Sequence, residues 1–357
     1  MPKVAVIILT YNGLKYLPNL LGSLFDFLPQ TLEEEVIVVD NHSSDGTVPW
    51  LRENYASVAI LEQSANLGFA AGNNVGLRYA LERNFDYLLL LNQDTIVTSG
   101  YLEQLVGELE KNPRAAAVQP KLMLYPLTDL VNSLGNVIHY LGFGYTYGNK
   151  TRIHDPRPSR RGGQSRKPTN EINYCSGAAC LLRASALKKA GLFDDQLFIY
   201  HEDLDLGWRF SLLGYRNLVC PEAVVYHQYE FSRSIRKYYY MERNRFIVLL
   251  KNYHWLTILV ILPALVIMEV GLLFFSFGNG WWREKLKVYA YFLKPSSWRA
   301  IFVKRAAIQK IRQFKDREIV RSFSGKIEHQ EVDNPVVRAI NPFFDAYWQV
   351  VKNLIFW

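Results

Sequence analysis

Short apolar runs bounded by turn-forming residues recur through the first part of this 357-residue chain. Continuous apolar runs are typical of strands that are buried on both faces of a sheet. Between them, Leu14 to Phe27 and Asn73 to Arg83 show the apolar spacing of amphipathic helices. Strands that alternate with helices predict parallel βαβ units. The expected strands are Val4 to Leu9, Glu35 to Val39, Val58 to Leu61, Tyr87 to Leu91 and Ala116 to Val118.

The regular pattern weakens after Gly135 and returns later. His154 to Asn170 is rich in proline, glycine and basic residues, which predicts a mobile loop. Tyr174 to Arg183 predicts a strand of small residues, and a helix is expected from about Leu204 to Gly214. The pattern therefore indicates an α/β fold with a Rossmann-like, mostly parallel sheet flanked by helices, followed by a C-terminal helical region.

An apolar segment, Trp255 to Phe277, dominates the second part of the chain. As a helix it is long enough to cross about 30 Å of hydrocarbon. Pro263 and Glu269 interrupt it, and basic residues flank both ends, contrary to a one-sided positive-inside bias. We therefore expect a re-entrant or interfacial hairpin with both ends on the cytoplasmic side.

A second segment, Trp298 to Arg321, has the pattern of an amphipathic helix. Ile301, Ile308 and Phe314 recur at near-helical spacing among many basic residues. This pattern is typical of a helix that lies on anionic lipid. The alternative is a helix packed on the catalytic domain or on a second subunit, which would make a homo-oligomer.

Charge divides the chain in two. Residues 1–230 contain 20 basic and 24 acidic residues, a net charge of −4, whereas residues 231–357 contain 21 and 9, a net charge of +12. We interpret 1–230 as a catalytic domain and 231–357 as a basic, apolar, membrane-associating region. The acidic first part gives little support to nucleic-acid binding, and the basic second part suits an anionic membrane surface.

The cysteines and the N-terminus bear on the compartment. Cys175, Cys180 and Cys220 match neither a disulfide framework nor a common zinc pattern, so they are expected to be reduced, buried thiols in the cytosol. The first apolar run ends at Thr10 to Gly13 without a small-residue cleavage site, so it is interpreted as a buried strand and not as a signal peptide.

Acidic motifs follow several of the apolar runs in a fixed order. Asp40, Asp94 and the pair Glu202 and Asp203 each stand near the end of such a run. A strand that delivers a carboxylate at its C-terminal end is how open α/β sheets build nucleotide and metal sites. The order of these motifs therefore indicates an enzyme.

Together these motifs carry a resemblance. Thr10-Tyr11-Asn12, Val39-Asp40-Asn41 with Ser44-Asp45-Gly46-Thr47, Asn66-Leu67-Gly68-Phe69, Asn92-Gln93-Asp94, Ser176-Gly177-Ala178 and Glu202-Asp203 stand in this order. Over roughly residues 3 to 250 the chain resembles family 2 inverting glycosyltransferases of the GT-A fold, and most of all their bacterial and archaeal rhamnosyltransferase-like group. The resemblance implies a nucleotide-diphosphate sugar donor, a divalent metal and single displacement.

The resemblance assigns the donor site to residues at the strand ends. Thr10, Tyr11, Asn12 and Asp40 are expected to bind the nucleotide, Asp40 by accepting a hydrogen bond from a base N–H. The remaining expected donor contacts are Asn66, Gly68, Asn92 and Gln93. A glycine before a helix permits close approach of a phosphate, although Asn-Leu-Gly is also an ordinary turn. Asp45 is instead expected to shape a turn and cap a helix that begins near Thr47.

The expected metal is Mn²⁺ or Mg²⁺, because hard cations take carboxylate oxygens and neutralise a diphosphate leaving group. Asp94 is the first expected ligand. His227 stands where the family often places another ligand, and imidazole favours manganese. The alternatives are a helix-capping role for Asp94 and a structural role for His227. The family motif usually has an acid where this chain has Asn92.

Inversion requires a base that takes the proton of the acceptor hydroxyl. By resemblance Asp203 is the expected base, and Glu202 is an acceptor contact or a second candidate. One of the two is expected to be held by a local donor, either Arg209 or a helix amide. The alternative is that both acids simply favour the N-terminus of the following helix. The basic and aromatic segment from Arg233 to Arg245 is expected either to hold a diphosphate or to form the solvated side of a helix.

The expected function is transfer of a sugar at the cytoplasmic face of the membrane. The donor would be a dTDP- or UDP-sugar, with rhamnose chosen by resemblance, and the acceptor a glycan or a polyprenyl-diphosphate-linked glycan. Two other functions stay open: a sugar nucleotidyltransferase, although Thr10 to Gly13 lacks a basic phosphate loop, and a non-catalytic glycan-binding or scaffold subunit, which Asn92 would allow.

Overall fold

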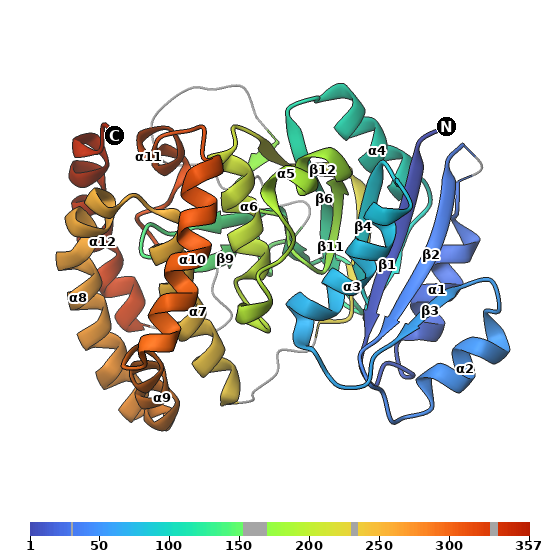
Figure 1. The fold of residues 1–357 in the computed structure, drawn as a ribbon, viewed down its shortest axis with the longest axis horizontal. Helices are drawn as coiled ribbons and strands as arrows, with labels where there is room; N and C mark the ends of the chain where they lie inside the picture. Colours follow the sequence, from blue (N-terminus) through green and yellow to red (C-terminus); the bar gives the residue numbers. More distant parts are fainter. Residues whose placement is uncertain (30, 153–169, 230–234, 329–334) are drawn as a thin grey trace.

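A mixed β-sheet forms the centre of the N-terminal part in the computed structural model, which describes residues 1–29, 31–152, 170–229, 235–328 and 335–357 (Figure 1). Its strand order is β10-β12-β6-β11-β4-β1-β2-β3, with β5 paired to β12 and β7 to β6. The strands are β1 (Lys3–Thr10), β2 (Glu33–Asp40), β3 (Ala59–Glu62), β4 (Tyr87–Asn92), β5 (Thr95–Val97), β6 (Ala115–Leu124), β7 (Val131–Ser133), β10 (Glu171–Ile172), β11 (Ala179–Arg183) and β12 (Arg216–His227). A separate hairpin joins β8 (Asn136–Ile138) and β9 (Gly144–Thr146).

The predicted parallel units are confirmed. Strands β4, β1, β2 and β3 pair in parallel, whereas β11 is antiparallel to both β4 and β6. The side chains of β1 alternate between two apolar cores: Val6 and Ile8 enter one, and Ala5 and Ile7 enter the other. This burial on both faces explains the unbroken apolar run in the sequence.

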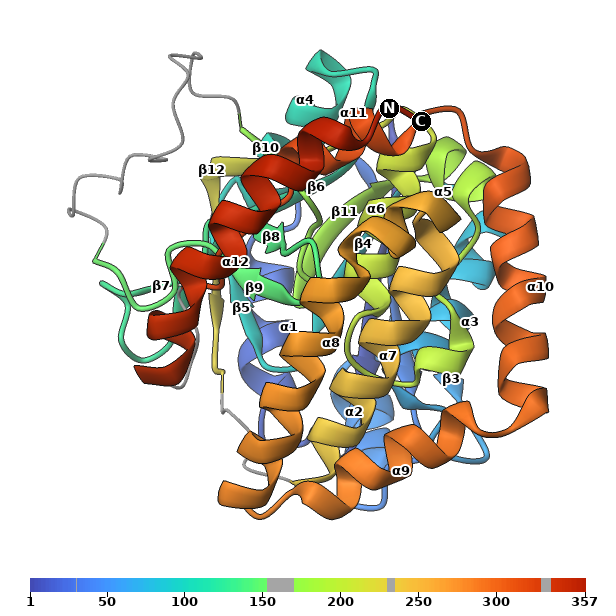
Figure 2. The ribbon, with the colours of Figure 1, turned by 90° about the vertical axis from the view of Figure 1, so that its left-hand side faces the viewer.

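Helices cover both faces of the sheet (Figures 1 and 2). They are α1 (Leu17–Asp26), α2 (Thr47–Asn54), α3 (Gly68–Glu82), α4 (Tyr101–Lys111), α5 (Ala184–Ala190) and α6 (Glu202–Leu212), with a 3₁₀ turn η1 (Asp195–Leu197) before α6. Helix α3 begins five residues before the predicted start at Asn73, and α6 begins two residues before the predicted Leu204. The predicted strand from Tyr174 is confirmed only for its second half, β11.

The C-terminal part is helical and packs against α6. It contains α7 (Arg236–Asn252), α8 (Trp255–Gly278), α9 (Trp282–Phe292), α10 (Pro295–Ile311), α11 (Asp316–Ile319), η2 (Val320–Ser322) and α12 (Pro335–Leu354). Trp208 of α6 makes edge contacts with the rings of Tyr253 and Phe323, at centroid distances of 4.6 and 4.8 Å. One apolar core therefore joins α6 to the C-terminal helices.

The hairpin expected within Trp255 to Phe277 is wrong. The segment is one continuous helix, α8, with Pro263 exposed on its surface. Glu269 does not interrupt the helix, because Arg245 and Lys285 neutralise its carboxylate. In the described residues α8 is the one helix whose length and composition would suffice to cross a membrane, and 22% of its most apolar window is buried.

The predicted helix from Trp298 to Arg321 is also wrong in its extent. Helix α10 ends at Ile311, and the backbone amides of Gln313 and Phe314 then donate to the carbonyl of Leu212 at the end of α6. The inner face of α10 packs on the protein through buried Ile301 and Ile308, as the alternative interpretation expected.

All three cysteines are free and buried, as predicted. Most of the predicted loop from His154 to Asn170 lies outside the described residues, as does Arg233. The division at residue 230 stays a prediction.

Candidate functional site

Three polar side chains end neighbouring strands of the sheet. Thr10 of β1 lies opposite Asp40 of β2 in the parallel register, and Leu9 lies opposite Asn92 of β4. Because these strands are parallel, their C-terminal ends meet at the same edge. The sheet thus brings Thr10, Asp40 and Asn92 together, from positions that are far apart in the sequence.

Gln93 organises the turn after β1. Its Oε1 atom accepts hydrogen bonds from the Thr10 hydroxyl at 2.8 Å and from the Tyr11 amide at 2.9 Å. A Cβ atom on Gly13 would lie 2.5 Å from this oxygen, so the turn needs glycine there. Tyr11 is 46% exposed at this edge, where an aromatic ring offers a flat face to a base.

Asn12 and Asp45 tie this turn to the loop after β2. Asn12 Oδ1 accepts from the Ser44 amide at 2.8 Å. Asp45 accepts from the Leu14 amide and from the amide and hydroxyl of Thr47, the first residue of α2. The expected turn-shaping role of Asp45 is confirmed. The side-chain oxygen of Asn12 is likewise used in a hydrogen bond within the protein.

Asp40 has an acceptor to spare. It is 3% exposed, and its Oδ2 atom accepts from the Ser43 amide at 3.0 Å. Its Oδ1 atom is buried and has no hydrogen-bond partner among the described residues. A buried acceptor without a donor costs free energy, which a ligand N–H would recover.

Asn66 and Gly68 form a turn that is occupied by protein atoms. Asn66 Oδ1 accepts from the Gly68 amide at 2.9 Å and from Asn41 Nδ2 at 3.1 Å. Gly68 has φ of 79°, and a Cβ atom there would lie 2.4 Å from the ring of Phe198. The Ala70 amide donates to the Phe198 carbonyl. The glycine therefore makes room for Phe198, and a phosphate there would have to share the turn with this ring.

Asp94 and His227 face each other across the β5–β12 pairing. Tyr226 and His227 pair with Ile96 and Thr95, and Asp94 immediately precedes β5. The distance from His227 Nε2 to Asp94 Oδ1 is 3.3 Å, and neither atom has a hydrogen-bond partner in the described part of the chain.

Asn132 explains why these two atoms suit a cation. His227 Nδ1 lies 3.0 Å from Asn132 Oδ1, and in the tautomer in which Nδ1 donates to this oxygen, Nε2 keeps a lone pair. Two buried acceptors that face each other without a donor fit a divalent cation. Sequence reasoning missed Asn132, because β7 brings it to His227 from 95 residues away.

Two protein ligands are a partial set. Across the described ranges, no cluster of three or more His, Cys, Asp or Glu side chains could hold a metal alone. Asn92 is tied by its backbone: its amide donates to the Ala178 carbonyl at 2.9 Å, and its carbonyl accepts from the Thr95 hydroxyl. Oxygen ligands from a substrate would have to complete the coordination of Mn²⁺ or Mg²⁺.

Asp203 is joined to the same edge through the segment before β11. Its Oδ2 atom accepts from the Gly177 amide at 3.2 Å, and its Oδ1 atom accepts from the Leu204 amide at 2.7 Å. Gly177 adjoins Ala178, the residue that Asn92 contacts. Burial raises the pKa of the Asp203 carboxyl to about 6, although these two amides lower it. A carboxylate with such a pKa suits a general base near neutral pH.

Glu202 and Arg209 have other surroundings than expected. Glu202 is 5% exposed, its Oε2 atom has no partner among the described residues, and burial raises the pKa of its carboxyl well above the ordinary value. Arg209 pairs with Asp205 at 2.9 Å and with carbonyls of residues 190–192. Backbone amides, and not Arg209, therefore hold Asp203. Glu202 and Asp203 also lie in the first turn of α6, in agreement with the alternative that these acids favour the N-terminus of the helix.

The solvated face expected within Arg233 to Arg245 is wrong for Lys237 and for the last three residues, all of which are buried. Arg243, Asn244 and Arg245 are 8%, 0% and 0% exposed. Arg243 and Asn244 donate to backbone carbonyls between Gln196 and Tyr200, and Arg245 pairs with Glu242. These contacts leave few donors for a diphosphate, although Arg245 Nε is buried with no hydrogen-bond partner among the described residues.

Comparison with known proteins agrees with this geometry. The model of the family described as "Glycosyl transferase family 2" matches residues 5–191. An N-acetylglucosaminyl-diphospho-decaprenol L-rhamnosyltransferase of Mycobacterium tuberculosis is 29% identical over 242 residues, which are 64% of this chain and 75% of the relative. The low-salt glycan biosynthesis hexosyltransferase Agl10 of Haloferax volcanii is 21% identical, over 58% of this chain and 61% of its own.

Solved structures share the fold. GalNAc-T7 with UDP, GalNAc and Mn²⁺ superposes with a TM-score of 0.52 at 15% identity, over 68% of this chain and 47% of that chain. TarS of S. aureus gives a TM-score of 0.50 at 18% identity, over 98% of this chain and 55% of that chain. The chain thus spans about half the length of these two neighbours. This protein belongs to glycosyl transferase family 2, has the GT-A fold and is similar to rhamnosyltransferases.

Proposed function

We propose that this glycosyltransferase is metal-dependent and inverting, and that it transfers rhamnose from a nucleotide-diphosphate sugar to a lipid-linked glycan. The proposal rests above all on Asp203, a half-buried carboxylate with a pKa of about 6 that backbone amides hold beside the edge where Thr10, Asp40 and Asn92 end their strands. Such a carboxylate has the proton affinity that a general base needs.

The chain's own residues account for the transfer step. Asp203 takes the proton of the acceptor hydroxyl while that oxygen bonds to the anomeric carbon. The bond from this carbon to the diphosphate oxygen breaks, and the nucleoside diphosphate leaves with the electron pair. Attack from the face opposite the leaving group inverts the configuration. Tyr11 and Asp40 orient the base of the donor, by stacking and through the spare Oδ1 acceptor.

Asp94 and His227 would hold the metal, with Asn132 fixing the imidazole. A divalent cation bound there would neutralise charge on the diphosphate. Asn92 and Gln93 adjoin this site: Gln93 holds the Thr10 turn, and the Asn92 side chain would contact the ribose. Asn66 and Gly68 contribute by keeping the start of α3 in place.

Donor and acceptor are proposed from the relatives. The mycobacterial relative is named as a rhamnosyltransferase that acts on a diphospho-decaprenol-linked sugar, which supports a deoxyhexose donor and a polyprenyl-diphosphate acceptor. Such an acceptor would require residues 231–357 to meet a membrane, with residues 1–230 catalysing transfer at its cytoplasmic face.

Donor consumption tests this function. Purified protein is incubated with dTDP-rhamnose, other dTDP- and UDP-sugars, and Mn²⁺ or Mg²⁺, with and without a polyprenyl-diphosphate glycan. Metal-dependent release of one nucleotide, lost in Asp94→Ala and Asp203→Asn, is expected. Glycan binding without release from any donor would contradict the proposal and favour a non-catalytic binding subunit.

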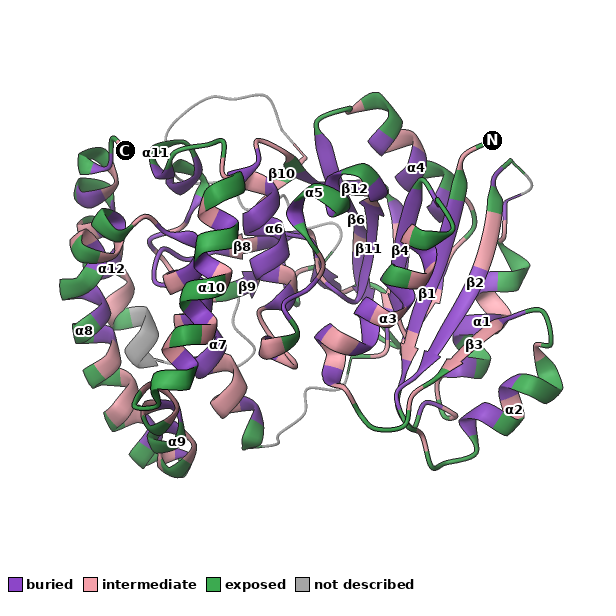
Figure 3. Cartoon of the chain, viewed as in Figure 1, coloured by how far each residue is buried: buried purple, intermediate pink, exposed green. Residues whose placement is uncertain are grey.

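The surface that suits a bilayer is the outer face of α8 together with that of α12. The exposed large apolar residues of α8 are Trp255, Leu256, Leu259, Leu262, Val266, Ile267, Val270, Phe274 and Phe277, and those of α12 are Phe343, Val350 and Leu354. The Tyr347 hydroxyl of α12 donates to the Val260 carbonyl of α8, so the two helices form one edge of the molecule (Figures 1 and 3).

Two features favour lipid over water on this face. The apolar residues are continuous along a 24-residue helix, which is unusual for a surface in water. Exposed Arg283 and Lys287 on the adjoining α9 suit anionic headgroups.

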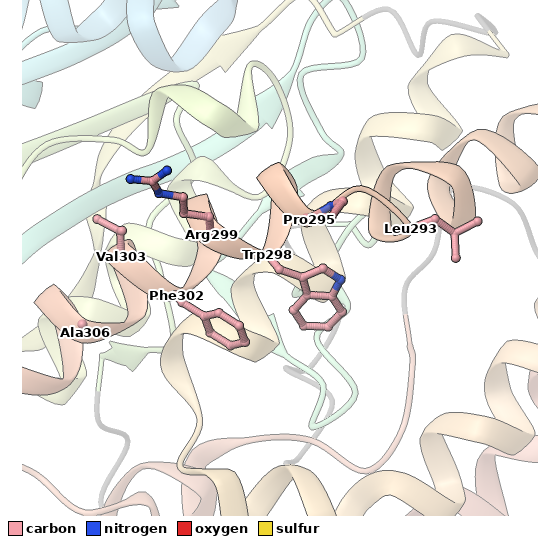
Figure 4. A pocket seen from close by; sticks show the side chains of 7 residues that line it. All are labelled: Leu293, Pro295, Trp298, Arg299, Phe302, Val303 and Ala306. Atoms are coloured by element: carbon pink, nitrogen blue, oxygen red, sulfur yellow. The ribbon is translucent and has the colours of Figure 1, made fainter.

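Figure 4 shows the Trp298 and Phe302 rings along α10, at an open depression that Leu293 also lines. Because Glu269 is paired to α7 and α9 residues, we propose that α8 lies against the protein and does not cross the bilayer alone.

Flotation with vesicles tests this surface. Val266→Glu with Phe274→Glu should abolish binding to anionic vesicles. Leu127→Glu, which changes an equally exposed leucine in the loop after β6, should leave binding unchanged. Failure of the wild type to float, together with a dimer that the double variant dissociates, would assign the face to a second copy of the chain.

A further inference from the structure

The residues before Asp203 form an unusual backbone turn. Phe198 has φ of 63° and ψ of −62°, and the Ile199 amide donates to the Leu197 carbonyl at 2.7 Å. These values define the rare γ-turn with positive φ. Tyr200 and His201 also have positive φ, of 68° and 70°. Because none of these residues is glycine, the conformation persists only where surrounding contacts enforce it.

Asn244 of α7 supplies the central contacts. Its side chain is fully buried, and Nδ2 donates to the carbonyls of Leu197, Ile199 and Tyr200 at 2.8, 2.9 and 2.7 Å. One amide group thus bridges three carbonyls of a single turn. A nitrogen with two hydrogens that meets three acceptors has no capacity left for a ligand.

Arg243 determines which way this amide faces. Its Nε and Nη2 atoms donate to Asn244 Oδ1 at 2.9 and 2.7 Å, so the oxygen points to the guanidinium and the nitrogen to the turn. Arg243 Nη2 also donates to the carbonyls of Gln196 and Leu197. The two neighbouring residues of α7 therefore act on the same turn.

The turn also reaches the donor side. The Phe198 ring fills the space above Gly68 and stacks on Tyr240 of α7, with ring centroids 5.1 Å apart. The Phe198 carbonyl accepts from the Ala70 amide at the start of α3. Movement of the turn would therefore displace both the start of α6, which carries Asp203, and the start of α3.

We propose that Asn244, oriented by Arg243, is a positioning residue for sugar transfer: it holds the turn from Gln196 to His201 and thereby fixes the place of Asp203. The inference rests on the proposed role of Asp203 as the base. A purely structural role for Asn244 would instead affect stability without a specific effect on the chemical step.

The principal variant is Asn244→Leu, which keeps the size of the side chain and removes its donors. We expect kcat to fall about 100-fold, as for displacement of a catalytic group by roughly 1 Å. The KM for the donor should change less than kcat, because the strand ends are untouched and only the start of α3 moves with the turn on the donor side. A wild-type kcat in folded Asn244→Leu protein would overturn the proposal.

Asn252→Leu is the matched control. Asn252 is also fully buried on α7, and its Nδ2 atom donates to Asp205 and not to the turn. Both variants should lower the melting temperature similarly, whereas kcat of Asn252→Leu should fall less than about tenfold. Equal losses of kcat would assign Asn244 to general stability and overturn the proposal.

Hydrogen exchange separates this inference from the proposed function. Without substrate, Asn244→Leu should speed the exchange of amides 197–201 and leave those of β1 unchanged. Arg243→Lys, which loses the planar fork, should do the same to a smaller extent, and it carries the test if Asn244→Leu fails to fold. Unchanged exchange at the turn would overturn the inference. If the wild type has no transferase activity, the proposed function is refuted. The hydrogen exchange of amides 197–201 would still show whether Asn244 holds the turn.

Discussion

The donor side and the base side of the site are built by different means. On the donor side, Thr10, Asp40 and Asn92 end neighbouring parallel strands, and the pairing of the strands places them together. On the base side, Asp203 follows a turn in which Phe198 and two further residues have positive φ. Each of these backbone conformations costs about 1–3 kcal/mol of conformational free energy. The donor side is thus held by regular structure, and the base side by contacts from a helix that follows later in the chain.

The difference teaches where each half is vulnerable. Strand pairing spreads over many hydrogen bonds, so a single substitution at the donor edge alters a contact and leaves the edge in place. The base side depends on a few side chains of α7. Loss of one of them displaces the group that carries the chemistry.

The largest expected effect separates chemistry from donor binding. Asp203→Asn removes the proposed base and should lower kcat by roughly 10²–10⁴-fold. Nucleotide binding, measured by calorimetry, should change little, because the strand-end residues remain. A parallel loss of binding would show that the two sides are not separable, and a loss of less than tenfold in kcat would exclude Asp203 as the base.

The metal pair offers the next test. Asn132→Leu leaves Asp94 and His227 in place but removes the partner of Nδ1. We expect a loss of about 10- to 100-fold in Mn²⁺ affinity. Calorimetric titration of Mn²⁺ with nucleoside diphosphate present provides the measurement, with Asn136→Leu, another buried asparagine near β7, as control. An unchanged Mn²⁺ affinity would mean that Asp94 and His227 have a structural role and do not bind the metal.

The pH dependence should report the base side. Because the ionised form of Asp203 accepts the proton, kcat/KM should rise about tenfold per unit below a pKa of about 6 and level off above it. Burial raises this pKa in the folded state, so protonation stabilises the fold, and stability falls as pH rises toward 6. If the melting temperature at pH 5 is not lower than at pH 7, the loss of kcat/KM at low pH results from protonation of Asp203 and not from unfolding. A flat profile from pH 5 to 8 would contradict the assignment.

The smallest expected effect belongs to the donor side. Asp40→Asn exchanges a charged acceptor for an amide and should raise the donor KM about five- to tenfold, with kcat nearly unchanged. Steady-state kinetics with the same donor provide the measurement, and Asp45→Asn, a turn residue, is the control. A fall in kcat without a change in KM would place Asp40 on the chemical step.

The sequence by itself determined the strands, their alternation with helices and the acids that follow them. These features depend on local periodicity and on the direction of each strand, so β1, β2 and β4 were predicted within about two residues of their observed bounds. The buried state of the three thiols followed from composition.

The tertiary structure alone decided which side chains meet. The pairing of β5 with β12 brings His227 to Asp94, and β7 adds Asn132, although no local pattern connects these residues. Asn244 resembles a surface residue in a basic segment, and only the packing of α7 against α6 and η1 buries it at the turn. Glu269 likewise predicted a break in α8, but Arg245 and Lys285 neutralise it. Charge and burial depend on partners that are distant in sequence, and the chain must fold before those partners exist.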